Sequence, residues 1–143
     1  GEKFSHKMSV ELSKKKQIII LCGHYEGFDE RIREGLPVRE ISLGDFILTG
    51  GELGALCIID SVTRNLDGAL GKITSSYTDS FADGLLEYPQ YTKPRNYRGY
   101  EVPEELLKGY HKLINEYHKE QKIIRTKQKR PDLYEKWKNQ KTI

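Results

Sequence analysis

The spacing of apolar residues changes along the first half of the chain and predicts alternating helices and strands. Apolar residues recur every four positions within residues 1–16, which predicts a helix. Residues 17–21 then form a short and almost wholly apolar run, a pattern typical of a central strand in a parallel sheet. Asp29 predicts the cap of a short helix that ends at Gly35. This order of elements indicates an α/β fold.

Residues 38–42 predict a second strand, which leads into the most distinctive stretch of the chain, residues 42–64. The apolar residues 46–48 suit the buried end of a strand. Thr49 and Glu52 have the spacing of a capping box, in which each side chain accepts a backbone N–H at the start of a helix. The residues that follow are apolar on most sides, which predicts a buried helix.

Two glycine turns follow the two predicted strands. Gly50 and Gly51 have no Cβ, so a ligand or another backbone segment can approach them closely. The turn at residues 23–27 stands where open α/β sheets bind ligands, at the carboxyl end of a strand. Neither turn has the spacing of a dinucleotide-binding or phosphate-binding loop. Together the turns favour a binding site, whereas each alone is explained by a helix start or a tight turn.

The second half of the chain predicts a long connection and then helices. Residues 67–92 are rich in Gly, Ser, Thr, Tyr and Asp and have few periodic apolar positions. From Pro103 the apolar residues return to helical spacing, with acidic residues in the first turn. Pro131 and Asp132 predict the start of a final helix. We therefore expect an α/β part, a linker and a small helical part.

Composition narrows the class of protein. The 143 residues are 36% hydrophobic and 31% charged, which fits a modest folded domain. No apolar run approaches the roughly 20 residues that span a bilayer, so we expect no membrane segment. Cys22 and Cys57 are too few for a disulfide framework or a zinc site, which predicts reduced core thiols and a cytoplasmic location. The histidines show no metal-ligand pattern, so no metal is expected.

The positive charge is concentrated near the carboxyl end. Residues 103–143 contain 11 Lys and Arg against 6 Asp and Glu, although the net charge of the whole chain is only +3. Residues 121–130 contain five cations and no acidic residue. This density favours a phosphate-bearing partner. A solvated helix face explains the same composition about equally well.

Arg64 and Asp79 are the candidate catalytic residues. Arg64 lies four residues after Asp60, so it forms either an ordinary ion pair along a helix or a fixed cation that stabilises a developing anion. Asp79 lies in the predicted linker, where it either caps a turn or acts as a general base once the linker is ordered around a substrate.

Several motifs in a fixed order give the chain a specific resemblance. Together they closely resemble the bacterial tRNA (guanine-N1)-methyltransferase family over nearly the whole chain. The motifs are the segments Leu21 to Arg31, Ser42 to Glu52, Ile59 to Arg64, Asp79 to Glu87, Tyr91 to Pro94, Glu101 to Pro103, and Arg130 to Leu133.

The resemblance implies a fold, a reaction and partners. The implied fold is α/β, a trefoil-knotted parallel sheet of the SPOUT class followed by a small all-α domain. The implied enzyme is a homodimer that transfers a methyl group from S-adenosylmethionine to N1 of the guanosine immediately 3′ of a tRNA anticodon. The implied parts are the carboxyl-terminal portion of the cofactor-binding domain (1–70), a linker (71–86) and a helical tRNA-binding domain (87–143).

The resemblance also implies roles for individual residues. Asp79 would remove the proton from guanine N1, and Arg64 would stabilise the charge that then develops on O6. Lys122, Arg125 and Lys129 would grip the tRNA backbone. The implied cofactor-binding residues lie in two motifs: Gly23, Tyr25, Glu26, Gly27, Ser42, Leu43, Gly44, Asp45, Phe46, Ile47, Leu48, Gly50 and Gly51.

The resemblance implies that the family's Ser-Pro-x-Gly cofactor loop would lie at or just before Gly1, so only its glycine could remain, and that the preceding half of the catalytic domain is missing. The chain is therefore expected to be an N-terminally truncated fragment. In the family the base comes from the linker of the opposite subunit, so neither subunit would be complete alone. The alternative hypothesis is a basic, non-catalytic RNA-binding module whose glycine turns are purely structural.

Overall fold

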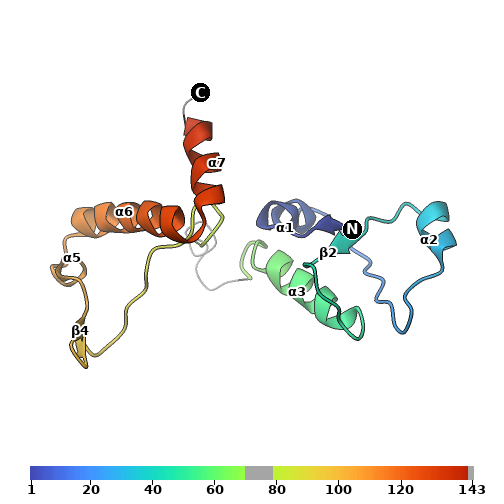
Figure 1. The fold of residues 1–143 in the computed structure, drawn as a ribbon, viewed down its shortest axis with the longest axis horizontal. Helices are drawn as coiled ribbons and strands as arrows, with labels where there is room; N and C mark the ends of the chain where they lie inside the picture. Colours follow the sequence, from blue (N-terminus) through green and yellow to red (C-terminus); the bar gives the residue numbers. More distant parts are fainter. Residues whose placement is uncertain (70–78, 142–143) are drawn as a thin grey trace. The chain divides into compact units, whose positions relative to one another are not determined.

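The computed structural model describes residues 1–69 and 79–141 (Figure 1). It divides into two compact units, Gly1–Ser76 and Tyr77–Ile143, and each is described by itself. Residues 71–78 of the predicted linker lie outside the described residues.

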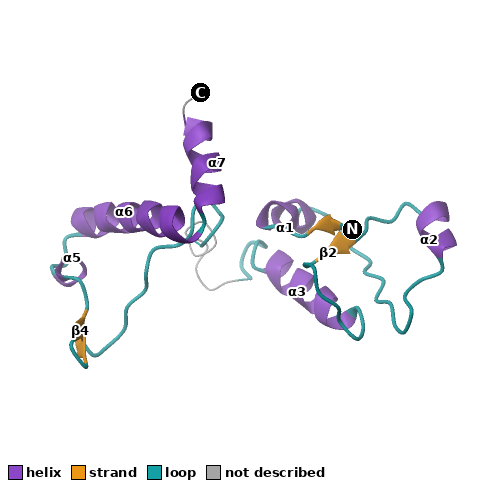
Figure 2. Ribbon diagram, in the orientation of Figure 1, coloured by secondary structure: helices purple, strands orange, loops and turns teal. Residues whose placement is uncertain are grey.

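The first unit has a small parallel sheet and three helices in its described part (Figure 2). Strands β1 and β2 pair in parallel, with Glu2 opposite Ile41. Helix α1 packs on helix α3, and this contact buries Met8, Ala55 and Ile58. The α/β class is therefore as predicted. The elements are β1 (Glu2–Lys3), α1 (His6–Ser13), α2 (Glu30–Gly35), β2 (Ile41–Ser42) and α3 (Glu52–Thr63).

Local sequence signals place the first two helices. The Asp29 carboxylate accepts the Arg31 N–H at 3.0 Å, and α2 ends at Gly35, so the predicted cap and stop are both confirmed. The helix predicted within residues 1–16 is also confirmed as α1, where the Ser5 hydroxyl accepts the Met8 N–H at 3.3 Å. Short polar side chains at the first position satisfy N–H groups that have no partner inside the helix.

The predicted strands are largely wrong. Residues 17–21 form no strand, and Ile19 is 77% exposed. The strand predicted at residues 38–42 is reduced to β2, which is two residues long. A strand needs a neighbour for its backbone N–H and C=O groups. Among the described residues of this unit, the only paired strands are β1 and β2, so the apolar run at 17–21 has no strand paired with it.

The predicted burial of residues 46–48 and of helix α3 is also wrong. Ile47 is 95% exposed, and Leu56 in the middle of α3 is 59% exposed. Cys57, predicted to be a core thiol, is exposed as well. The physical reason is that α1 covers only one side of α3, so the other apolar side has no covering element among the described residues.

The second unit contains a hairpin and three helices in its described part. Residues 79–86, predicted as linker, belong to this unit. Helix α6 packs against both α5 and α7. The hairpin turn has Arg98 and Gly99 at positive φ, as two-residue hairpin turns require. The prediction of an all-helical unit is wrong, because this hairpin is part of it. The elements are β3 (Asn96–Tyr97), β4 (Tyr100–Glu101), α5 (Glu104–Leu107), α6 (His111–Lys129) and α7 (Pro131–Lys141).

The helices of the second unit follow their local signals closely. The helical pattern that begins at Pro103 is confirmed, but it is divided into α5 and α6 at Gly109, whose φ is +70°. Glycine adopts this left-handed conformation without steric cost, and it commonly ends a helix. Helix α7 begins at Pro131 as predicted. Within the described residues, no helix combines the length and the apolar character that crossing a membrane would require.

Candidate functional site

The structure brings the two predicted glycine turns together. The Gly51 N–H donates to the Gly23 carbonyl at 3.0 Å. His24 forms isolated antiparallel bridges with Gly27 in its own turn and with Gly50 in the other. Two segments about 25 residues apart in the chain therefore form one backbone structure at the amino-terminal end of α3.

The contact between the two turns is so close that it requires glycine at position 51. A Cβ added at Gly51 would lie 2.8 Å from the Cα of Cys22 and 3.0 Å from the N of Gly23. Both atoms belong to the backbone and cannot move aside cheaply. Gly27 has a φ of +101°, which favours glycine for a conformational reason. The sequence predicted that either a ligand or another backbone segment approaches Gly50 and Gly51. In the structure, a backbone segment does so.

Glu52 pairs with His24 across the two turns, a contact that the sequence did not indicate. The predicted capping box, which begins at Thr49, is wrong. The N-cap residue of α3 is Gly51, and no side chain makes a cap hydrogen bond there. A hydrogen bond from its own backbone N–H, followed by the bond to His24, lowers the pKa of Glu52. The carboxylate thus holds both the helix start and the first glycine turn. The only sequence feature that could have pointed to His24 was its position within the motif Leu21 to Arg31.

The remaining predicted cofactor residues lie on exposed or half-exposed loops. Ser42 closes a local turn, in which its hydroxyl accepts the Gly44 N–H at 3.2 Å. The Phe46 ring lies over Gly44, 2.7 Å from where a Cβ would be. Tyr25 is fully exposed at a positive φ of 54°. The exposed or half-exposed residues are Glu26, Gly27, Leu43, Gly44, Asp45, Ile47, Leu48 and Gly50.

The two candidate catalytic residues belong to different units. Arg64 follows the last residue of α3, and its N–H donates to the Asp60 carbonyl at 3.1 Å. Asp79 is the first described residue of the second unit, and its carbonyl accepts the Ala82 N–H at 3.3 Å. Each therefore lies next to an ordered backbone turn: one ends a helix, and the other begins a tight loop.

The three predicted tRNA-contacting cations differ in their surroundings. Lys122 is only 8% exposed, and its ammonium donates to the Asp83 carboxylate at 2.6 Å. Arg125 is half-buried, and its Nε is buried with no hydrogen-bond partner. Lys129 is exposed at the end of α6. The sequence did not reveal the pairing of Lys122, because Asp83 lies 39 residues away.

An aromatic cluster on α6 is a second feature that the sequence did not indicate. The rings of Tyr88 and His118 stack with centroids 3.6 Å apart. Burial lowers the pKa of His118, so the neutral ring is favoured. Burial, followed by a hydrogen bond with Tyr91, raises the pKa of Tyr117 to about 12. The residues around 88–91 are thus held against one side of α6.

Comparison with known proteins gives consistent matches over nearly the whole chain. Residues 1–136 match the family described as tRNA (Guanine-1)-methyltransferase TrmD. A tRNA (guanine-N(1)-)-methyltransferase of Halalkalibacterium halodurans is 56% identical over 135 residues, which are 94% of this chain and 55% of that protein. A tRNA (guanine-N(1)-)-methyltransferase of Staphylococcus aureus strain JH9 is 56% identical over 137 residues, 96% of this chain and 56% of that protein.

The chain spans about half the length of the curated relatives that it matches. The matched region includes both glycine turns, Arg64, Asp79 and helix α6. With a family match over residues 1–136 and 56% identity to two relatives, the chain belongs to the tRNA (guanine-1)-methyltransferase family, TrmD.

Proposed function

We propose that this chain forms part of an enzyme that methylates N1 of the guanosine immediately 3′ of a tRNA anticodon, with S-adenosylmethionine as the methyl donor. The observation that supports this most strongly is the 56% identity to relatives that carry the name tRNA (guanine-N(1)-)-methyltransferase. The chain would supply the carboxyl-terminal half of a cytoplasmic, SPOUT-type knotted protein. Its parts would be the cofactor domain (1–70), the linker (71–86) and the tRNA-binding domain (87–143).

The paired glycine turns would bind the cofactor. They lie on exposed or half-exposed loops, and Gly51 already lets two backbone segments lie in contact. Such a loop pair fits a ligand that is held mainly through backbone N–H and C=O groups. Residues 23–27 would form one wall, and residues 42–51 the other. When bound, S-adenosylmethionine supplies an electrophilic methyl group on a sulfonium.

Asp79 and Arg64 would act on the guanine. Guanine N1 carries a proton at neutral pH, so a base must remove it before the nitrogen can attack a methyl group. The Asp79 carboxylate would accept that proton. The negative charge that then develops on O6 would be stabilised by the Arg64 guanidinium, which presents several N–H donors in a fixed plane.

A second copy of the chain would complete the site. The uncovered apolar side of α3, with Leu53, Leu56 and Ile59 each at least half exposed, is consistent with a further protein surface packing on it. In the proposed homodimer, Asp79 of one subunit would act opposite Arg64 of its partner.

The tRNA backbone would be gripped by Arg125 and Lys129. Arg125 has a buried Nε without a partner, and Lys129 is exposed on the same helix. In the proposed complex their positive charges would attract phosphate oxygens, which give affinity without reading sequence. Lys122, the third predicted contact, is ion-paired with Asp83. Its burial favours a structural role over a phosphate contact.

The test uses a completed protein, in which this chain is joined to the amino-terminal part of the Halalkalibacterium halodurans relative. We expect it to bind S-adenosylmethionine in calorimetry and to transfer a labelled methyl group to a tRNA that has guanosine 3′ of its anticodon. The same tRNA with adenosine at that position serves as the control. RNA binding without cofactor binding would contradict the proposal and leave the chain as a non-catalytic RNA-binding module.

A further inference from the structure

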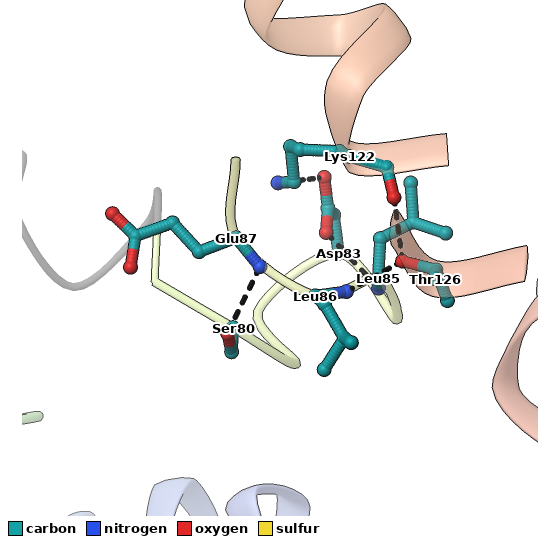
Figure 3. A network of polar contacts seen from close by, with 7 residues as sticks. All are labelled: Ser80, Asp83, Leu85, Leu86, Glu87, Lys122 and Thr126. Carbon is teal, nitrogen blue, oxygen red and sulfur yellow. Dashed lines mark hydrogen bonds and ion pairs between the residues drawn. The ribbon is translucent and has the colours of Figure 1, made fainter. Parts of the chain in front are cut away.

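The turn segment that begins with the proposed base, residues 79–87, is attached to helix α6 at two points (Figure 3). The Lys122 ammonium donates to the Asp83 carboxylate at 2.6 Å. The Leu86 N–H donates to the Thr126 hydroxyl at 2.9 Å. Because the two helix residues are four positions apart, both attachments lie on the same side of α6.

The attachment points on the helix are buried. Thr126 is completely buried, and its hydroxyl also donates to the Lys122 carbonyl at 2.6 Å. The side chain of Lys122 is only 10% exposed. Leu85 of the segment is buried as well. A buried donor or charge that loses its partner is costly, so the segment and the helix are expected to move together.

Hydrogen bonds inside the segment connect these attachments to Asp79. The Phe81 N–H donates to the Leu85 carbonyl at 2.7 Å. The Glu87 N–H donates to the hydroxyl of Ser80, the residue next to Asp79, at 2.9 Å. Phe81 adopts a φ of +73°, which a residue other than glycine keeps only where its surroundings hold it. The backbone at Asp79 is therefore fixed relative to α6.

We propose that Asp83 and Lys122 are a positioning pair that holds the backbone next to Asp79 in the geometry needed to take a proton from guanine N1. This inference rests on the proposed function. Arg125 and Lys129 lie on the same helix, so contact with the tRNA backbone and placement of the base are joined through α6. A displacement of about 1 Å can cost about 100-fold in rate, so a pair that never touches the guanine can control the reaction.

The experiment measures single-turnover methylation and tRNA binding by the completed protein. Lys122→Met keeps the aliphatic stem of the side chain, and Asp83→Asn keeps an oxygen that can accept the Leu85 N–H. We expect each change to lower the single-turnover rate about 10- to 100-fold, while the Kd for tRNA changes less than about twofold. Lys122→Arg is expected to restore part of the rate. The double variant is expected to be no slower than the slower single one, because both changes break one contact.

Lys119→Met is the matched control, since Lys119 is an exposed lysine on the same helix. It is expected to leave the rate and the Kd for tRNA unchanged. Wild-type rates for both Lys122→Met and Asp83→Asn would overturn the positioning role, as would equal losses of rate and tRNA affinity. If Lys122→Met fails to fold, Asp83→Asn decides by the same two measurements. A wild-type completed protein without methyl transfer contradicts the proposed function and the positioning role together, whereas unaffected variants of an active protein contradict only the positioning role.

Discussion

In helices α3 and α6, the residues that are buried are not those that the apolar or polar character of each sequence suggests. Helix α3 is apolar on most sides, yet Leu56 lies exposed in its middle. Helix α6 is basic and polar, yet Lys122 and Thr126 are among its buried residues. Burial depends on which other segment covers a helix as well as on the helix's own composition. Residues 79–87 cover the side of α6 that carries Lys122 and Thr126, whereas the side of α3 that carries Leu56 has no such cover among the described residues.

The largest expected effects concern the two proposed catalytic residues, one associated with each helix. In the completed protein, Asp79→Asn is expected to lower the methylation rate about 100- to 10,000-fold, the usual contribution of a general base. Arg64→Ala is expected to lower it about 100- to 1,000-fold, as for loss of an anion-stabilising donor. Calorimetry should show unchanged affinity for S-adenosylmethionine. Asp67→Asn, at an exposed acid near Arg64, is the control.

Mixing the two inactive variants tests whether the subunits share a site. A dimer of one Asp79→Asn and one Arg64→Ala subunit has one intact site if the two residues come from opposite subunits. Random mixing should then restore about a quarter of the wild-type rate. If mixing restores nothing, Asp79 and Arg64 do not act across a dimer. If either single variant keeps the wild-type rate, its assigned role is wrong.

The second prediction tests the uncovered side of α3 directly. In the 143-residue chain, Ile58→Ala should lower the free energy of unfolding by about 2 kcal/mol, because Ile58 is 9% exposed and packs toward α1. Leu56→Ala should change it by less than about 0.5 kcal/mol, since exposed residues contribute little. In the completed protein, the cost of Leu56→Ala should rise toward about 2 kcal/mol. Urea unfolding monitored by circular dichroism provides the measurement.

A constant small cost of Leu56→Ala in both proteins would show that this side of α3 stays uncovered in the completed protein. The proposal that a further surface packs on it would then fail. A large cost already in the 143-residue chain would contradict the exposure seen in the structure.

The sequence predicted features that depend on neighbouring residues and missed those that depend on distant ones. The cap at Asp29 and the start of α7 at Pro131 are confirmed, because each is decided within one helical turn. The pairing of Glu52 with His24, 28 residues away, and the pairing of Lys122 with Asp83, 39 residues away, were both missed. Pairing over such separations cannot be obtained from local spacing.

Likewise, only those features of the candidate site that depend on a residue's own type could be predicted from the sequence. The absence of a Cβ at Gly51 predicted a close approach, and the structure contains one. Which segment approaches, the turn at residues 23–27, was left open. The roles of Asp79 and Arg64 came from family resemblance, and they stay predictions until the variants are measured.

The third prediction compares two glycines at the start of α3. Gly51→Ala should lower the free energy of unfolding by about 1–3 kcal/mol, the usual cost of an overpacked contact, because its Cβ would meet the backbone of Cys22 at 2.8 Å. Gly54→Ala should raise it by about 0.5–1 kcal/mol, as alanine does inside a helix. Its Cβ would make an ordinary contact of 3.7 Å with Leu43.

Both changes add the same methyl group within one turn of the same helix, so each controls for the other in thermal unfolding. Equal effects of the two changes would contradict the close contact between the two glycine turns.

The smallest expected effect is a pH dependence at the start of α3. The pKa of Glu52 is lowered from 4.5 by its own backbone N–H and then by His24, so the folded state favours the charged carboxylate. The stabilisation is therefore present above about pH 4.5, the unfolded value, and is lost as the pH falls through the lowered folded-state pKa. Glu52→Gln should remove this acid loss, and His24→Gln should remove only the smaller part. Because Glu52 is exposed, the effect is small and requires unfolding curves at closely spaced pH values and low salt. An acid loss that is the same in wild type and Glu52→Gln would show that the contact between the two turns does not depend on the charge of this carboxylate.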